Sequence, residues 1–292
     1  MSDTAHNSDN YCYRHLDRQS FILCQRCGRT ICPQCSTQAA VGVHCPECVK
    51  EARQAAPKRK PRLLTALRRP SSSVNAVPVV TYSLIGINLV VFGLQWLTGG
   101  ALTDAWYYAP FFTGAEPWRM ITSMFLHSQG SIFHIIFNMY SLFIFGPILE
   151  SLVGRLRFLA LYLLAGFGGS VAVLLLGAPE VGVLGASGAI FGLFGAYFLI
   201  ARKLGGNSTQ LLVLIVLNLA LGFLVTGISW QAHVGGLAVG LAIAFVYLQT
   251  RRREQRKWQI ALVGVVAVVL VGITIVAYQL KIVPFIMSLY GQ

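Results

Sequence analysis

A serine and a histidine stand near the starts of two apolar segments, each beside glycines spaced four residues apart. The serine lies in Gly185-Ala186-Ser187-Gly188, with Gly192 four residues after Gly188, and the histidine is His233, which Gly236 and Gly240 follow. A membrane-embedded histidine needs a partner or a wet cavity, whereas a serine can bond to its own helix. Glycines four apart let membrane helices approach closely. The pattern predicts a serine nucleophile with a histidine base; the alternative is a glycine packing seam that contains an incidental serine.

A second polar pair lies in an earlier apolar segment. His134 and Asn138 are four residues apart and so share one helix face. Donors aligned in this way suit a developing oxyanion, and the alternative is a structural histidine bonded to a neighbouring helix. With Ser187 as nucleophile and His233 as general base, we expect His134, Asn138 and the Ser187 backbone N–H to be the oxyanion donors.

The predicted site has no acid to orient its histidine. Between residues 98 and 250 the acidic residues are Asp104, Glu116, Glu150 and Glu180, and none lies on the fourth, fifth or sixth apolar segment. We therefore predict a dyad in which packing orients His233. Phe191 lies one helical turn after Ser187 and is placed to stack beneath the imidazole ring.

The composition predicts an all-α polytopic membrane protein. The 292-residue chain has a mean hydropathy of +0.64 and 11% charged residues, which excludes an ordinary soluble domain. Seven segments are apolar enough and of suitable length to span a bilayer. They lie at 79–97, 131–152, 156–177, 184–201, 210–226, 230–249 and 259–280.

The net charge of +13 is concentrated beside these spans. Basic clusters precede the first span and follow the second, fourth and sixth, so the positive-inside rule places the amino terminus in the cytoplasm and the carboxyl terminus outside. We expect a plasma-membrane protein that does not bind nucleic acid. His134, Ser187 and His233 then share one depth near the outer face. A transporter, the rival class, would carry charged groups at the midplane.

The amino-terminal region has four ligand pairs with the spacing of zinc sites. The pairs are Cys12-x2-His15, Cys24-x2-Cys27, Cys32-x2-Cys35 and Cys45-x2-Cys48. They suffice for two structural Zn²⁺ ions, and the alternative disulfide framework is disfavoured in a reducing cytoplasm. We favour cross-bracing, with Cys12, His15, Cys32 and Cys35 on one ion, and Cys24, Cys27, Cys45 and Cys48 on the other; His44 is available in place of Cys45. The region resembles a B-box-type finger, which implies a cytoplasmic protein partner.

These patterns divide the chain into five parts. We predict disorder at 1–10, the two-zinc module at 11–49, a basic Pro/Ser-rich linker at 50–78, a six-helix core at 79–250, and a basic loop with a seventh helix at 251–292. The linker has leucines among its arginines, so it suits either the inner membrane surface or a flexible tether.

The core resembles the rhomboid family of intramembrane serine proteases. The matching motifs are Trp118-Arg119, His134-x3-Asn138, Gly185-x-Ser187-Gly188 and His233-x2-Gly236-x3-Gly240, within about residues 79–250. The resemblance implies a six-helix core, no cofactor for catalysis, single-span membrane proteins as substrates, and catalysis by Ser187 and His233. Phe191 stands where relatives often have tyrosine. Glu150 matches a family acid, but Leu152 stands where a partner arginine often follows. An inactive, client-binding relative is the alternative within this family.

Overall fold

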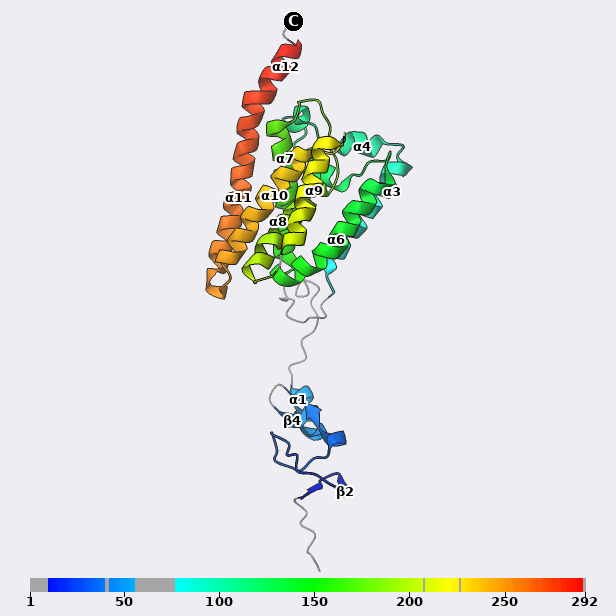
Figure 1. Cartoon of the computed structure of the whole chain (residues 1–292), viewed down its shortest axis with the longest axis vertical. Coiled ribbons are helices and arrows are strands. Elements are labelled where there is room, and N and C mark those ends of the chain that lie inside the picture. Colours follow the sequence, from blue (N-terminus) through cyan, green and yellow to red (C-terminus); the bar gives the residue numbers. More distant parts are fainter. Residues whose placement is uncertain (1–9, 40–41, 56–76, 207, 226, 291–292) are drawn as a thin grey trace, which may run out of the picture. The chain divides into compact units, whose positions relative to one another are not determined.

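The computed structural model describes residues 10–39, 42–55, 77–206, 208–225 and 227–290. It divides into a small amino-terminal unit and a large helical unit (Figure 1). The expected disordered segment at 1–10 lies almost entirely outside the described residues, as does most of the expected linker at 50–78.

The small unit consists of short strands and turns around cysteine side chains. Its elements are β1 (Tyr11–Cys12), β2 (His15–Gln19), η2 (Pro33–Cys35), β3 (Thr37–Gln38), β4 (Val43–His44) and α1 (Pro46–Ala55). β1 pairs antiparallel with β2, and β3 with β4. Six cysteines and Ile31 form its buried core. The final helix continues to Ala55, past the boundary expected at residue 49, and Cys48 in its first turn is the one expected ligand that it contains.

The large unit is a helical bundle. Its elements are α3 (Val79–Leu97), α4 (Ala101–Trp106), η3 (Pro110–Thr113), α5 (Arg119–Thr122), η4 (Ser123–Phe125), α6 (Ile132–Val153), α7 (Arg155–Leu176), α8 (Ser187–Lys203), α9 (Thr209–Leu224), α10 (Trp230–Gln249), η5 (Arg253–Gln255), α11 (Arg256–Ala277), the π-helical η6 (Tyr278–Ile282) and α12 (Val283–Tyr290). A helix therefore occupies each of the seven apolar segments.

Five helical stretches of the described chain are long and apolar enough to cross a membrane: α3, α6, α7, α10 and the continuous stretch Arg253–Leu289. The helices α8 and α9 have 17 and 16 residues. At ~1.5 Å per residue they are shorter than a hydrocarbon core of ~30 Å. A count of seven crossings therefore stays a prediction. The seventh helix differs from its expected bounds, since it begins at Arg256 and continues to Tyr290.

Glycines bring α7, α8 and α10 into backbone contact. A Cβ atom at Gly236 would overlap the Gly188 carbonyl, and one at Gly240 would overlap the Gly192 carbonyl. On the other side of α10, a Cβ at Gly235 would overlap the carbonyl of Gly168 in α7. The glycine spacing of the sequence predicts the α8–α10 contact but not the part played by the glycines of α7. α10 thus lies beside both helices, and α11 runs along the edge of the bundle (Figure 1).

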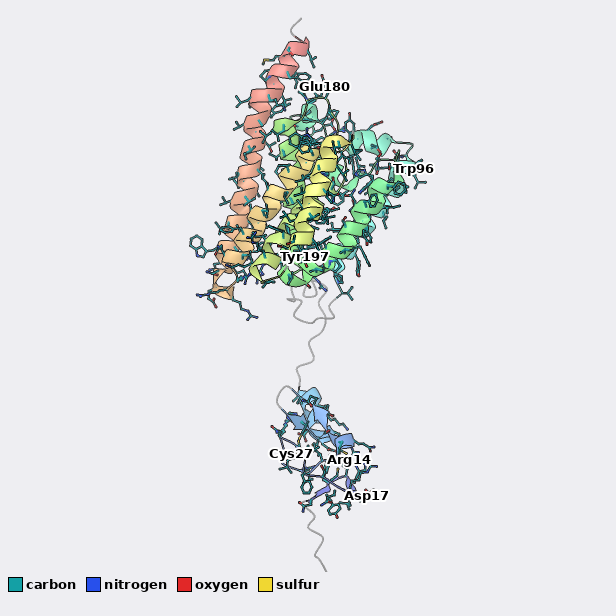
Figure 2. The ribbon with its side chains drawn as sticks, in the orientation of Figure 1. Arg14, Asp17, Cys27, Trp96, Glu180 and Tyr197 are labelled. Carbon is teal, nitrogen blue, oxygen red and sulfur yellow. The ribbon has the colours of Figure 1, made fainter. Side chains whose placement is uncertain are left out.

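Apolar side chains cover much of the periphery of the bundle, as a lipid-facing surface requires. Phe133, Phe137 and Tyr140 on α6 are exposed, as is Val268 on α11. Trp96 projects near the end of α3 (Figure 2). Exposed aromatic and aliphatic side chains at this density would be unfavourable in water but are favourable in hydrocarbon.

Glu150 joins the start of α3 to the end of α6. Its carboxylate accepts hydrogen bonds from the Val80 N–H at 3.1 Å and from the Thr81 N–H and hydroxyl at 2.8 Å each. It therefore satisfies N–H groups that have no acceptor within a helix. Arg155 Nε lies 3.8 Å from the same carboxylate. Arg155 thus supplies a cationic partner although Leu152 does not.

Candidate active site

Three helices begin at one end of the bundle, which we call the site end. His134 is in the first turn of α6, Ser187 is the first residue of α8, and His233 is in the first turn of α10. A Cβ built on Gly185 would lie 2.7 Å from His134 Nε2 and 3.9 Å from Ser187 Oγ. The imidazole and the hydroxyl therefore flank the same small space.

The loop before α8 fixes the position of Ser187. Gly185 has a φ of 126°, a left-handed conformation that favours glycine, and its N–H donates to the Ser123 carbonyl at 2.9 Å. Earlier in the loop, Val183 exchanges two backbone hydrogen bonds with Tyr108. α8 consequently begins at Ser187, three residues later than expected. The first N–H groups of a helix have no intrahelical acceptor and carry a partial positive charge, so they suit an anionic oxygen.

His134 presents a hydrogen-bond donor to this space. The Ser128 N–H donates to His134 Nδ1 at 3.1 Å, so the neutral ring carries its hydrogen on Nε2. Asn138 Nδ2 donates to the His134 carbonyl at 2.7 Å, which uses one of its two amide hydrogens within α6. Among the described residues, no hydrogen bond joins Asn138 to α8. His134 is therefore the better placed of the two expected side-chain oxyanion donors.

His233 is held by ring stacking. The rings of His233 and Phe191 are 4.0 Å apart and inclined by only 10°. His233 is 6% exposed, and its Nδ1 has no hydrogen-bond partner in the described part of the chain. A Cβ on Gly188 would lie 3.3 Å from the Ala232 carbonyl, so the backbones beside the serine and the histidine are in contact. The described residues contain no hydrogen bond between Ser187 and His233, and such bonds are often long in apo structures.

Gln95 and His127 also lie at the site end, and the sequence analysis gave neither a role. The Gln95 amide clamps the His127 backbone, accepting from its N–H and donating to its carbonyl at 2.9 Å each. The His127 ring is fully buried, 5.2 Å from the His134 ring. Burial, together with the neighbouring His134, lowers the pKa of His127 to about 3, so its ring is neutral. Gln95 is a polar residue within the apolar helix α3, and this feature of the sequence could have indicated the contact with His127.

Trp118 and Arg119 belong to the connection between α3 and α6. Arg119 is 6% exposed and lies 4.2 Å above the Phe112 ring. Its Nε donates to Glu116 at 2.7 Å and its Nη1 to the Asp104 carbonyl at 2.6 Å. Trp118, in contrast, is about half exposed. Arg119 therefore stabilises the connection, and neither residue touches the candidate catalytic groups in any contact of the described chain.

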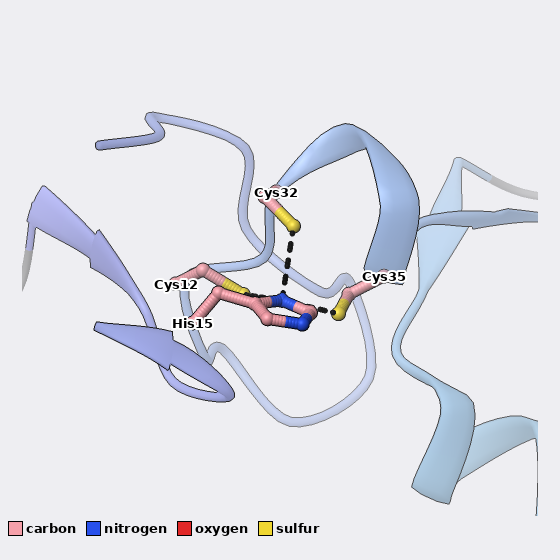
Figure 3. A group of neighbouring side chains, drawn as sticks. All are labelled: Cys12, His15, Cys32 and Cys35. Carbon is pink, nitrogen blue, oxygen red and sulfur yellow. Dashed lines mark hydrogen bonds between the residues drawn. The ribbon is translucent and has the colours of Figure 1, made fainter. Parts of the chain in front are cut away.

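The small unit brings the first and third of its ligand pairs together in one group. Cys12, His15, Cys32 and Cys35 have ligand atoms within 4.8 Å of one another. His15 Nδ1 lies 3.8, 3.5 and 3.4 Å from the three sulfurs, as Figure 3 shows. One ring nitrogen cannot donate to three sulfurs at once. These separations fit the edges of a tetrahedron around Zn²⁺, for which metal–ligand bonds of about 2.0–2.3 Å are expected.

Cys24, Cys27, Cys45 and Cys48 form the second group, again within 4.8 Å. Backbone N–H groups donate to sulfur in this group, including Cys45 N–H to Cys24 Sγ at 3.2 Å. Burial favours the neutral thiol of Cys24, but hydrogen bonds from the Cys45, Cys27 and Arg26 backbones lower its pKa to about 6. Cys27 is exposed (Figure 2). The group contains Cys45 rather than His44, which lies in β4 opposite Thr37.

Comparison with known proteins identifies the helical unit. The rhomboid domain family matches residues 114–250. The rhomboid protein YdcA of Bacillus subtilis (strain 168) is 35% identical over 144 residues, which cover 48% of this chain and 71% of YdcA. The rhomboid protease GluP of the same organism is 35% identical over 182 residues, covering 58% of this chain and 35% of GluP.

A plant relative shows the same resemblance. RHOMBOID-like protein 6, mitochondrial, of Arabidopsis thaliana is 37% identical over 156 residues, which cover 50% of this chain and 48% of the relative. The chain thus spans less than half the length of this relative and of GluP. The family match contains His134, Asn138, Ser187 and His233, and it lies outside the small unit and α11. With its apolar helices and this match, the chain is a multi-pass membrane protein that belongs to the rhomboid family.

Proposed function

We propose that this protein is an intramembrane serine endopeptidase with a Ser187–His233 dyad. One observation carries the proposal: His134 Nε2 and Ser187 Oγ flank one space at the site end, where the His233 ring is stacked on Phe191. A nucleophile, a base and an oxyanion donor are the three parts that acyl transfer requires. GluP is named as a rhomboid protease, which supports the same activity here.

The reaction follows from the position of each group. Ser187 Oγ attacks the scissile carbonyl carbon while His233 takes the hydroxyl proton through Nε2. The carbonyl oxygen becomes an oxyanion that accepts hydrogen bonds from His134 Nε2–H, the Ser187 N–H and Asn138. When the C–N bond breaks, His233 gives its proton to the leaving amine. His233 then deprotonates a water molecule that attacks the carbonyl carbon of the acyl-enzyme. The bond between this carbon and Ser187 Oγ breaks, His233 returns the proton to Oγ, and the acid is released.

The substrates in this proposal are single-span membrane proteins, cut near the outer face of the plasma membrane. The amino terminus lies in the cytoplasm and the carboxyl terminus outside, as the basic loops indicate. All seven apolar helices cross the membrane, including the short α8 and α9. Catalysis requires no cofactor, and the partners are membrane substrates and lipid rather than nucleic acid.

Two structural Zn²⁺ ions bind the small unit in this proposal. Cys12, His15, Cys32 and Cys35 hold one ion, and Cys24, Cys27, Cys45 and Cys48 hold the other. The ions supply the free energy of folding, because the core of this unit is made almost entirely of cysteines. The B-box-like unit serves to bind a cytoplasmic protein.

Labelling with a serine-reactive fluorophosphonate tests the catalytic proposal. The purified protein should be labelled and should cut a model single-span substrate, whereas Ser187→Ala and His233→Ala should do neither. Both variants should retain the thermal stability of the parent protein. A folded parent protein that is neither labelled nor active would favour the inactive, client-binding alternative. Cleavage that persists in Ser187→Ala would exclude the serine mechanism.

A further inference from the structure

A lysine within the seventh helix caps α7. Lys281 lies in the π-helical turn η6, and its Nζ donates to the carbonyls of Leu174, Leu175 and Gly177 at 2.9, 3.0 and 2.5 Å. The last carbonyls of a helix have no intrahelical donor and carry a partial negative charge. An ammonium group with three donors is therefore matched to this terminus.

Apolar packing holds the lysine in place. Leu174 and Ile282 are fully buried against one another, in a cluster that also contains Ala277. The chain before η6 is an α-helix and the chain after it is α12, so the π turn is a local change of register. Single π turns are rare and are frequently found at functional sites.

The same turn also contacts the connection between α3 and α6. A Cβ on Gly114 would overlap the ring and hydroxyl of Tyr278, so Tyr278 packs directly on the Gly114 backbone. This connection in turn binds the loop that leads to α8. Its Phe111 N–H donates to the Pro179 carbonyl at 2.9 Å, and Tyr108 pairs with Val183.

The loop at residues 178–186, together with Gly177 just before it, is therefore held at four places ahead of the nucleophile. Two contacts hold its start, from Lys281 to Gly177 and from Phe111 to Pro179. Tyr108 holds its middle through Val183, and Ser123 holds its end through Gly185. Phe111, Tyr108 and Ser123 lie in the segment 79–250, whereas Lys281 lies in the helix that follows this segment. Without Lys281, the Phe111–Pro179 bond alone would hold the start of this short loop, so the residues that lead to Ser187 would gain freedom.

We propose that Lys281 is a positioning residue, through which the seventh helix fixes the loop that places Ser187 for attack. The inference rests on the proposed serine protease activity. It predicts a loss in the rate of acylation rather than in substrate binding, because the hydrogen bonds of Lys281 within the described chain all go to backbone carbonyls of residues 174–177, away from the proposed catalytic groups. A displacement of ~1 Å at a reacting atom can cost about 100-fold in rate.

The test compares Lys281→Met with Lys281→Arg and with Lys257→Met. Lys257 is an exposed residue at the opposite end of α11, so its variant controls for the loss of a charge on the same helix. Lys281→Met should lower kcat and the rate of fluorophosphonate labelling at least tenfold with KM within twofold. Lys281→Arg should recover most of the rate, because guanidinium also donates to carbonyls, and Lys257→Met should match the parent protein.

Hydrogen exchange supplies a readout that does not depend on activity. Amides at 178–186 should exchange faster in Lys281→Met but not in Lys257→Met. Gly114→Ala should have the same effect on exchange and labelling, because the new methyl group would push Tyr278 away from the connection between α3 and α6. This variant replaces Lys281→Met in the test if Lys281→Met does not fold. Parental labelling and exchange in folded Lys281→Met would refute the positioning role. A parent protein that is never labelled would refute the proposed function. In that case, unchanged exchange of amides 178–186 in Lys281→Met would still refute the role of Lys281 in holding the loop.

Discussion

Replacing Phe191 with leucine tests whether stacking alone orients His233, the proposed general base. The His233 ring lies 4.0 Å from the Phe191 ring at 10°. His233 Nδ1 has no partner in the described chain, and the acidic residues of the core lie outside α8, α9 and α10. In a triad, an aspartate would hold the imidazole and fix its tautomer. Here the aromatic face must limit the rotation of the ring.

The size of the effect follows from the strength of one aromatic contact. An aromatic pair contributes about 0.5–1.5 kcal/mol beyond its buried area. Since ~1.4 kcal/mol corresponds to a tenfold change in rate, loss of the stack should slow acylation by about 2- to 10-fold. Leucine keeps most of the apolar volume, so the cost to stability should stay below about 1.5 kcal/mol. Phe191→Tyr retains the ring and should act at nearly the parental rate.

The assay is the second-order rate of fluorophosphonate labelling, measured beside kcat for a model membrane substrate. Thermal unfolding of each variant in detergent shows whether the bundle is intact. A folded Phe191→Leu protein that reacts as fast as the parent would show that the stack does not orient His233. An equal loss in Phe191→Tyr would mean that the side chain matters for another reason, such as the shape of the space around Ser187.

Three further predictions concern the donors, the loop and the metals. His134→Ala and Asn138→Ala should each lower kcat and leave KM little changed. The loss should be about 10²–10³-fold for His134 as an oxyanion donor and smaller for Asn138, whose amide bonds within α6. A rise in KM alone, measured by steady-state kinetics, would contradict this role. Gly185→Ala should abolish labelling, because its left-handed backbone disfavours alanine and the new methyl would crowd His134 Nε2; a parental rate would exclude this. Chelation should release two Zn²⁺ per chain and unfold residues 11–55, which hydrogen exchange can detect. A chain that starts at residue 71 should still cut substrate. Release of fewer than two ions per chain would contradict the stoichiometry.

The sequence by itself located the apolar helices and the candidate chemistry. Hydrophobicity over a segment is a local property, so the expected spans 79–97 and 230–249 coincide with α3 and α10. The spacing of ligand pairs is also local, and the favoured cross-braced groups are the two that the structure assembles. The position of Ser187, His134 and His233 within their spans predicts that all three lie at a similar depth, without reference to any contact between them.

Only the tertiary structure decided the contacts between segments distant in sequence. α8 begins at Ser187 rather than at residue 184 because Gly185 bonds to Ser123 and Val183 to Tyr108. The backbone contacts of α7 with α10, the pairing of Arg155 with Glu150, and the capping of α7 by Lys281 likewise depend on which helix faces meet. Helix periodicity says which residues share a face, but not which face of another helix they contact, because that choice is made by the packing of the whole bundle.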